Sequence, residues 1–454
     1  MSNILSSVFF FLVALGVLIT IHEFGHYWVA RKCGVKVLRF SIGFGKPLWS
    51  TVRGKDQTEY MLAAIPLGGY VKMLDEREGE VEASELDRAF NRQSLMKRTA
   101  IVVAGPLANF ILAILAYWLV FVVGVTGMKP IVGDVSADSI AERAGVQYGD
   151  VVVAVAGKET PTWESVIISL LDESLDGGSV VIDVIPEAGV NTVQRDLWFD
   201  SIPKDLNRGG YLDFIGIRPS RPHIPPIIGK LAPGGAAEKS GIEVGDVLVA
   251  ADGVALADWE AWVEYVRARP LTAIALEVER EGVLLRLSIS PEKYETNQGV
   301  IGRIGAGVQL QQMPDELKAV LQYGVVESLG LAAIKTWDMS ILTLRMMGKM
   351  VTGDLSLSNL SGPISIAQYA GYSASAGIIS FLTFLAIVSI SLGVLNLLPI
   401  PMLDGGHLMY YAVEAVKGSP VSETTQILAQ KLGIAMLMGL MMLAFYNDIL
   451  RLFS

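Results

Sequence analysis

The sequence His-Glu-Phe-Gly-His at residues 22–26 is the pattern in this 454-residue chain that is most specific for chemistry. On a helix, side chains four positions apart share one face, so both imidazoles could bind one metal ion. Glu23 would lie beside that ion as the general base of a metal-dependent hydrolase. The motif follows residues 1–21, which contain no Lys, Arg, Asp or Glu. Ionisable groups at the end of such an apolar run are costly, which favours a functional site over a polar helix end at the membrane surface.

A catalytic zinc ion needs a third protein ligand and keeps one position open for water. No Gly-x-x-His continuation follows His26, and Cys33 lies about two helical turns further along. Asp404 and His407 are better candidates, and both belong to the segment Asn-Leu-Leu-Pro-Ile-Pro-Met-Leu-Asp-Gly-Gly-His at residues 396–407. Spacing alone leaves the choice between these two residues open.

The same segment carries residues that interrupt a helix. Pro399 and Pro401 lack amide donors, and Gly405 and Gly406 permit unusual backbone dihedrals. Membranes tolerate such an opened backbone only where protein or a water-filled cavity satisfies it, and a hydrolase needs a cavity of this kind. Asn396 is either a packing or capping amide, or a donor to the substrate backbone and the developing oxyanion.

Composition points to a membrane protein. Hydrophobic residues make up 52% of the chain and charged residues 18%, against about 25% charged in soluble domains. The net charge of −10 gives no support for nucleic-acid binding, and the single cysteine cannot form an internal disulfide. The chain has four histidines, so any histidine-rich metal site must draw on a short list.

Long charge-free runs predict a polytopic α-helical membrane protein with four spans. A cleaved signal peptide is a poorer interpretation of the first run, because no Lys or Arg precedes it. The predicted organisation is a first span with the His-Glu motif (1–30), a cytoplasmic loop with a membrane-associated β-hairpin (31–98), a second span (99–127), two inserted modules (128–220 and 221–312), an amphipathic connecting segment (313–375), a third span with the Leu-Asp-Gly motif (376–406) and a fourth span (430–450).

The distribution of basic residues predicts the orientation. Lys and Arg gather in residues 31–98, which should therefore be cytoplasmic, whereas the acidic stretch 129–310 should be translocated. The first and third spans then both run inward. Their ends, with Glu23 and Asp404, are expected to meet at a similar depth near the cytoplasmic face.

An internal repeat lies in the translocated stretch. Residues 141–150 match residues 237–246 at an offset of 96, and each copy predicts a short helix (139–144; 236–240), a glycine turn and a strand (151–155; 247–251). The shared pattern resembles PDZ domains in the permuted strand order of bacterial proteases, so two α+β modules are expected. PDZ domains bind an extended peptide along a sheet edge. The resemblance places the grooves on residues 214–218 and 305–309, namely Ile215, Gly216, Ile217, Ala306, Gly307 and Val308. Modules that act only as steric bulk are the alternative.

The chain resembles the site-2 protease family of intramembrane zinc metalloproteases nearly end to end. The resemblance is carried by the metal motif in the first span, by Asn-x-x-Pro-x-Pro-x-Leu-Asp-Gly in the third span and by the tandem PDZ-like modules between the second and third spans. This resemblance implies that His22, His26 and Asp404 bind one zinc ion and that Glu23 activates water. It therefore favours Asp404 over His407 as third ligand. It also assigns Asn396, with Pro399 and Pro401, to substrate binding.

Two further segments gain a role from the resemblance. Residues 60–73 predict a hairpin around Gly68-Gly69. In the family, such a β-loop dips into the membrane, so Gly68, Gly69 and Tyr70 are expected to hold an unwound substrate; an ordinary cytoplasmic hairpin is the alternative. In the second span, Gly105 and Ala108 permit close helix contact and Asn109 could hydrogen-bond into the core. Packing is the simpler role for these, although the family pattern gives Asn109 some claim to shaping the cleft.

The function implied is an endopeptidase of the bacterial inner membrane that cuts a single-span protein already trimmed outside, such as an anti-sigma factor in envelope stress signalling. Its partners would be that substrate, the lipid bilayer and a peptide or protein ligand of the periplasmic PDZ modules, with the active site near the cytoplasmic side. A non-catalytic PDZ adaptor is the alternative. A metal transporter fits less well, because its polar residues and repeats would lie within the membrane. Residues 314–348 further predict an amphipathic helix at the outer interface.

Overall fold

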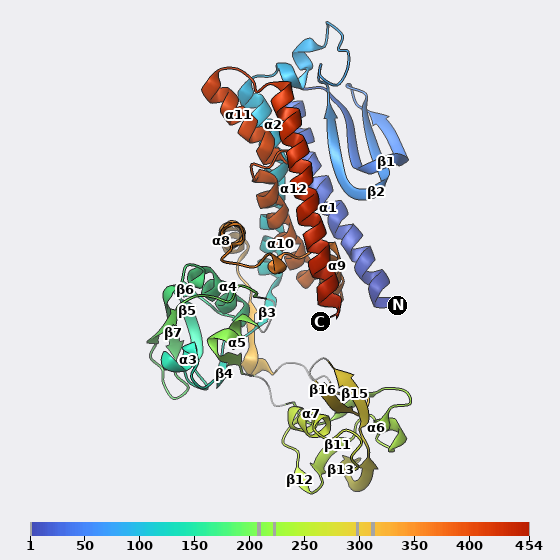
Figure 1. The fold of residues 1–454 in the computed structure, drawn as a ribbon, viewed down its shortest axis with the longest axis vertical. Helices are drawn as coiled ribbons and strands as arrows, with labels where there is room; N and C mark the ends of the chain where they lie inside the picture. Colours follow the sequence, from blue (N-terminus) through green and yellow to red (C-terminus); the bar gives the residue numbers. More distant parts are fainter. Residues whose placement is uncertain (1, 207–209, 221–223, 297–298, 310–313, 454) are drawn as a thin grey trace.

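The computed structural model describes residues 2–206, 210–220, 224–296, 299–309 and 314–453. A bundle of long helices forms one end of the molecule, and two α+β modules hang from its opposite end (Figure 1). Among the described residues, four helices are long and apolar enough to cross a membrane, which agrees with the four predicted spans. They are α1 (Ser2–Lys32), α2 (Leu95–Val123), α10 (Ile378–Leu397) and α12 (Glu423–Phe453).

Helix α2 is the centre of the bundle and packs against both α1 and α10. Ser94 caps its first turn by accepting a hydrogen bond from the Lys97 amide, and the chain leaves it at Gly124, which has φ 97°. A side chain at Gly25 of α1 would lie 2.2 Å from the Ala104 carbonyl oxygen of α2. The two helices therefore approach so closely that this position requires glycine.

A small sheet lies beside α1 and is built from β1 (Val37–Arg53) and β2 (Thr58–Met73) (Figure 1). Residues 37–42 pair with residues 69–73 on one side and with residues 59–62 on the other, while residues 47–53 pair with residues 58–63. The hairpin predicted around Gly68-Gly69 is only partly present. Residues 59–62 run parallel to residues 39–42, and residues 69–73 run antiparallel to residues 37–42, so the chain does reverse between residues 62 and 69. The two arms do not pair with each other, because residues 37–42 lie between them; the directly paired hairpin turns at residues 54–57, where Gly54 has φ 81°.

The first module, residues 132–219, contains the predicted repeat helix and strand. A four-stranded sheet in the order β6-β5-β7-β8 and a pair of strands, β4 and β9, enclose its apolar core. Its elements are β4 (Val132–Val135), α3 (Ile140–Arg143), β5 (Val151–Val155), β6 (Lys158–Glu159), α4 (Trp163–Ser174), β7 (Gly178–Ile185), β8 (Val193–Phe199), α5 (Tyr211–Ile215) and β9 (Ile217–Pro219).

The second module, residues 228–308, repeats this plan with sheet order β12-β11-β13-β14 and the strand pair β10–β17, and it adds a hairpin, β15–β16. Its elements are β10 (Ile228–Leu231), α6 (Ala236–Lys239), β11 (Val247–Ala251), β12 (Val254–Ala255), α7 (Trp259–Arg267), β13 (Ile274–Arg280), β14 (Val283–Ile289), β15 (Glu292–Thr296), β16 (Gly299–Arg303) and β17 (Ala306–Val308).

The first of the two expected groove strands is shorter than predicted. Ile215 ends the short helix α5, and Gly216 follows it in the left-handed region at φ 84°, so the strand begins only at Ile217. The helix forms because Tyr211 donates a hydrogen bond to the Leu170 carbonyl oxygen and Ile215 is fully buried in the module core. In the second module, β17 falls within the predicted range.

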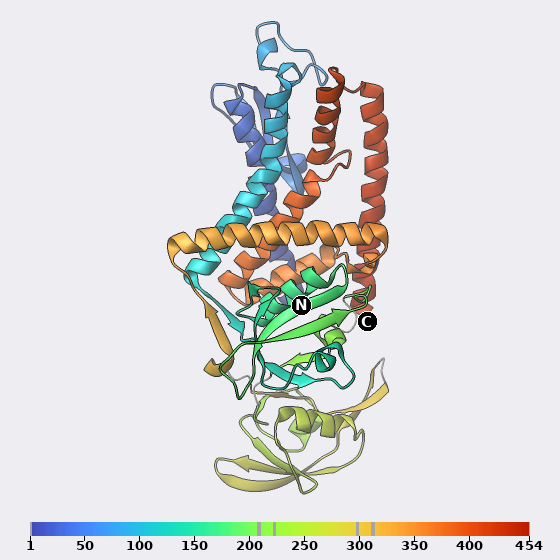
Figure 2. The ribbon, with the colours of Figure 1, turned by 90° about the vertical axis from the view of Figure 1, so that its left-hand side faces the viewer.

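An antiparallel ribbon of β3 (Val125–Met128) and β18 (Lys318–Leu321) joins the modules to the bundle. The predicted amphipathic helix therefore begins late, at Val325, because the residues before it are paired as a strand. This helix, α8 (Val325–Thr352), lies across the spans rather than along them (Figure 2). Arg345 and Lys349 bind Asp176 of the first module, at 2.7 and 2.9 Å. The hydrogen bonds from Lys349 and Arg345 hold the pKa of the Asp176 carboxyl below its usual value.

The chain then forms α9 (Pro363–Ser375), α10, α11 (Asp404–Lys417) and α12. The buried carboxylate of Asp448 on α12 accepts hydrogen bonds from the Gly362 and Ile364 amides, at 2.9 and 2.8 Å, and from the Ser365 hydroxyl at 2.6 Å. This carboxylate satisfies the first turn of α9, which fixes the C-terminal end of α12. Short 3₁₀ turns complete the described fold: η1 (Leu86–Arg88), η2 (Phe90–Arg92), η3 (Asp315–Leu317) and η4 (Leu357–Asn359).

Candidate metal centre

Two chain segments that are about 380 residues apart meet in the half of the bundle that lies farther from the two modules (Figure 1). Helix α1 carries His22, Glu23 and His26 in its last turns, and α11 begins at Asp404. Helix α10 ends at Leu397, and residues 398–403 lie outside any helix, so the break expected around Pro399 and Pro401 is present. The carboxylate of Asp404 is thereby held in the first turn of a helix and not inside a continuous span.

The three side chains form a compact group. Asp404 Oδ2 lies 3.2 Å from His22 Nε2, and Asp404 Oδ1 lies 3.5 Å from His26 Nε2. The two Nε2 atoms are 3.3 Å apart, and all three ligand atoms lie within 4.8 Å of one another. His407, the other candidate for third ligand, lies outside this group.

The surroundings of this group fit a metal ion. His26 Nδ1 lies 2.8 Å from the Ile101 carbonyl oxygen, which can only accept, so Nδ1 carries the proton and Nε2 keeps its lone pair. Asp404 Oδ2 is buried and has no hydrogen-bond partner among the described residues. Two imidazole nitrogens and a carboxylate oxygen that converge in this way are the donor set of a catalytic zinc site.

Glycines shape the backbone around the group. A Cβ atom at Gly105 of α2 would lie 2.3 Å from His26 Nε2 and 2.9 Å from His22 Cε1. Cβ atoms at Gly405 and Gly406 would lie 2.1 and 2.5 Å from the carbonyl oxygens of Leu398 and Ile400. Only glycine fits these positions. The sequence indicated close helix contact at Gly105 but gave no sign that the histidines themselves lie over it.

A cavity of about 460 Å³ surrounds the group. Of the predicted substrate-binding residues, Gly69, Tyr70 and Asn396 line it, whereas Gly68, Pro399 and Pro401 do not. A Cβ atom at Gly69 would lie 2.9 Å from Glu23 Cγ, so this part of β2 runs directly against the turn of α1 that carries Glu23. The rest of the lining comes from the same strand and the chain that follows it, from Ile101 and Val102 of α2, from Met402 and Leu403 in the break before α11, and from His407 and Tyr411 of α11.

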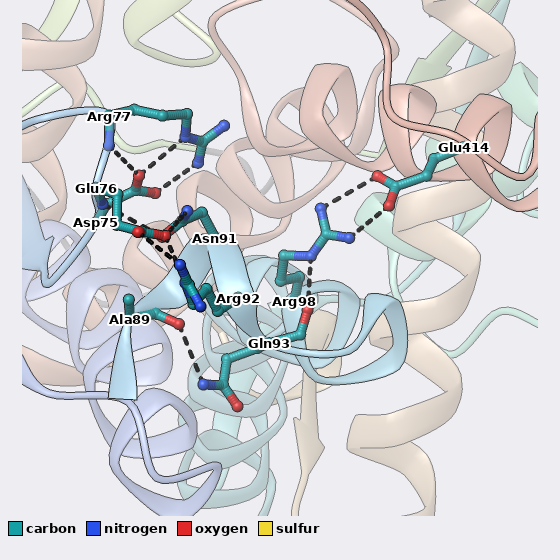
Figure 3. Close-up of polar contacts among 9 residues, drawn as sticks. All are labelled: Asp75, Glu76, Arg77, Ala89, Asn91, Arg92, Gln93, Arg98 and Glu414. Atoms are coloured by element: carbon teal, nitrogen blue, oxygen red, sulfur yellow. Dashed lines mark hydrogen bonds and ion pairs between the residues drawn. The ribbon is translucent and has the colours of Figure 1, made fainter. Parts of the chain in front are cut away.

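Two charged pairs that sequence reasoning missed, Arg98–Glu414 and Arg77–Asp75, fix the chain around the metal group (Figure 3). Arg98 of α2 binds the Glu414 carboxylate of α11 through two nitrogens, at 2.6 and 3.1 Å, and both side chains are largely buried. This pair fixes α11, and with it Asp404, against α2. Arg77 binds Asp75 in the same bidentate manner, at 2.9 and 2.5 Å, and both residues line the cavity. No local pattern marks such pairs, because their partners are distant or lie on irregular chain.

Comparison with known proteins gives matches along nearly the whole chain. The profile of peptidase family M50 matches residues 10–440. The chain is 47% identical over 444 residues to the regulator of sigma-E protease RseP of Escherichia coli, covering 97% of this chain and 98% of that protein. It is 46% identical over 455 residues to the regulator of sigma E protease of Salmonella typhi, with both chains fully covered. A Vibrio cholerae protein that is named as a zinc metalloprotease is 44% identical over 458 residues, again with both chains fully covered.

Proposed function

The chain belongs to peptidase family M50, the site-2 protease family of intramembrane zinc metalloproteases, and from this premise we propose that it cuts the membrane segment of single-span proteins whose outer domain has already been trimmed. The observation that carries the proposal is the convergence of His22, His26 and Asp404 beside Glu23 in a cavity bordered by a β-strand. The alternative of a non-catalytic adaptor is not adopted, because the family is one of peptidases and this chain keeps the ligand group and the candidate base.

His22, His26 and Asp404 would hold the zinc ion. In such a site zinc supplies Lewis acidity, which polarises a carbonyl group and makes water more acidic. Glu23 accepts the proton of the attacking water and passes it to the leaving amine. Asn396, in the last turn of α10, lines the cavity and can donate from its amide to the substrate backbone or to the developing oxyanion. Pro399 and Pro401 serve the site by ending α10.

A helical substrate must unwind before it can be cut, because its peptide bonds are held in internal hydrogen bonds. Residues 69–73 offer a place for the unwound segment. They pair with residues 37–42, and no other strand in the described chain pairs with their second edge. Gly69 and Tyr70 lie on this edge and line the cavity, and Gly68 (φ 151°) redirects the strand toward it. A substrate strand added here would regain backbone partners next to Glu23.

The sheet has the surface expected of a membrane-associated element. Large apolar side chains on its outer part are exposed: Phe44, Leu48, Trp49, Val52, Leu62 and Ile65. In a soluble loop such a patch would be unusual. The alternative of an ordinary cytoplasmic hairpin does not explain it.

The two modules are proposed to be PDZ domains. A cavity of about 650 Å³ lies between α7 and β17 of the second module and includes Trp262, Val263, Ala306 and Gly307. This is where an extended peptide would add to the sheet edge, with Val308 continuing the strand; Gly216 and Ile217 mark the corresponding edge of the first module. The tandem would admit short stubs and reject folded domains.

The chain is an inner-membrane protein. The excess of Lys and Arg in residues 31–98 favours a cytoplasmic position for that loop, with the modules in the periplasm and the metal site near the cytoplasmic side. Relatives named as regulators of sigma-E favour an anti-sigma factor in envelope stress signalling as the physiological substrate.

The test is cleavage by the purified full chain in bilayers. A single-span substrate with a short outer stub should be cut within its membrane segment, and the same substrate with a folded outer domain should resist. A zinc chelator should stop cleavage, and added Zn²⁺ should restore it. Cleavage that ignores the chelator would refute the metal mechanism, and equal cleavage of both substrates would refute the size filter.

A further inference from the structure

Asn109 of α2 is fully buried between the metal group and the third span. Its side-chain amide lies 3.2 Å from His22 Nδ1 on α1, and its main-chain carbonyl accepts a hydrogen bond from the Ser389 hydroxyl of α10 at 2.8 Å. One residue thus contacts α1 and α10 while belonging to α2. We propose that Asn109 is a positioning residue: its side-chain oxygen accepts the Nδ1 proton of His22 and so presents Nε2 to the metal.

The argument begins with the two nitrogens of His22. Only one nitrogen of a neutral imidazole carries a proton, and a metal binds the other. His22 Nε2 points at Asp404 and His26, so Nε2 is the metal-binding nitrogen and Nδ1 must carry the proton. A protonated Nδ1 needs an acceptor, and Asn109 is the residue placed against it.

Only one of the two polar atoms of the Asn109 side-chain amide has a hydrogen-bond partner among the described residues. In the structure its Nδ2 faces His22 Nδ1, and its Oδ1 is buried without a partner among the described residues. In that orientation Nδ1 would be the acceptor, the proton would sit on Nε2, and Nε2 could not bind a metal. Turning the amide by half a rotation exchanges two atoms of nearly equal size and puts Oδ1 against Nδ1. One amide atom lacks a partner either way, so metal binding decides which orientation is favoured.

The tautomer of His26 is fixed in the same way, but by a main-chain group. Its Nδ1 proton goes to the main-chain carbonyl of Ile101, 2.8 Å away, which no substitution at Ile101 removes. The Nδ1 atom of His22 instead faces a side chain, that of Asn109, which a substitution can remove. Outer partners of this kind fix the tautomer and orientation of a histidine ligand, and their loss costs about 10- to 100-fold in metal affinity. The proposal rests on the zinc site of the proposed function and adds a residue to it.

The experiment measures zinc affinity by competition with a chelator, on the purified full chain and without a substrate. Asn109→Leu keeps the branched shape of the side chain and loses the acceptor, and its affinity for zinc should fall about 10- to 100-fold. Asn109→Asp keeps an acceptor and should bind zinc within a few-fold of the wild type. Ser389→Ala is the matched control, because it removes an equally buried hydrogen bond to the main chain of the same residue and should leave the affinity unchanged.

A second readout reports the tautomer of His22 directly in the zinc-loaded wild type. With only four histidines in the chain, ¹⁵N-histidine spectra of the zinc-loaded wild type can be assigned with His→Gln variants at the other positions. His22 should carry its proton on Nδ1, and Asn109→Leu should shift the His22 signals and leave those of His407 in place. Asn109→Leu binding zinc as tightly as the wild type, Asn109→Asp losing as much as Asn109→Leu, or His22 protonated on Nε2 would overturn the proposal. Absence of zinc from the wild type would instead refute the proposed function.

Discussion

Glu23→Gln is expected to abolish proteolysis while the protein keeps its zinc. The substitution preserves the size and polarity of the side chain but removes the group that takes the proton from water. General acid–base catalysis contributes about 10²- to 10⁴-fold, so the rate of cleavage should fall by at least about 100-fold. Glu23 lines the cavity but is not one of the three grouped ligands, so metal content should not change. The measurement is single-turnover cleavage of the trimmed substrate together with metal analysis of the same sample.

The inactive variant also reports on the strand edge. In Glu23→Gln the uncut substrate should remain in the site, and a cysteine introduced at Tyr70 should crosslink to a cysteine near the scissile bond. Trp49, on the outer part of the same sheet and exposed, is the control position and should not crosslink. Cleavage by Glu23→Gln at the wild-type rate would show that another group is the base. Equal crosslinking at both positions would show that the substrate does not add to residues 69–73.

Gly105→Ala is expected to cost the protein both its zinc and its activity. The added methyl group would lie 2.3 Å from His26 Nε2 and 2.5 Å from His26 Cε1, far inside any contact that real Cβ atoms make. The His26 ring cannot simply turn aside, because Nδ1 is held by the Ile101 carbonyl. Either the ring leaves the ligand group or α1 and α2 move apart. Zinc content and cleavage should therefore fall together. The affinity for zinc should fall by at least about 100-fold if the His26 ring is displaced and its hydrogen bond to the Ile101 carbonyl is also lost.

Gly16→Ala is the matched control, because it adds a methyl group to a glycine of the neighbouring span α1 that has nothing within 4 Å of the new atom. This variant should bind zinc and cut substrate like the wild type. Thermal unfolding of both variants separates local damage at the metal group from general loss of the bundle. A Gly105→Ala protein that binds zinc normally would mean that His26 does not sit over Gly105 in the working enzyme.

The parts of the fold that could be predicted are those set by local pattern. Charge-free runs gave the spans, and the repeat at an offset of 96 gave β5 and β11 with the bounds that the structure has. The meeting of His26 with Asp404 was predictable too, because the distribution of Lys and Arg made the first and third spans run in the same direction. That argument needs no knowledge of helix packing.

Features that depend on distant partners could not be predicted. Gly68-Gly69 resembles the turn of a hairpin in sequence, and the chain does reverse just before it, but only the complete sheet shows that residues 37–42 lie between the two arms. Likewise Arg98 and Glu414 are ordinary surface residues until α11 is placed against α2. The role of Gly105 is visible only once the histidines lie over it.

The most direct test is the zinc content of three purified proteins: the wild type, Asp404→Ala and His407→Ala. Both substituted side chains line the same cavity, but only Asp404 belongs to the ligand group. Zinc should be present at about one ion per chain in the wild type and His407→Ala, as for a mononuclear site, and absent from Asp404→Ala. Full zinc retention by Asp404→Ala, with His22 and His26 intact, would contradict the claim that two distant segments of the chain hold one metal ion.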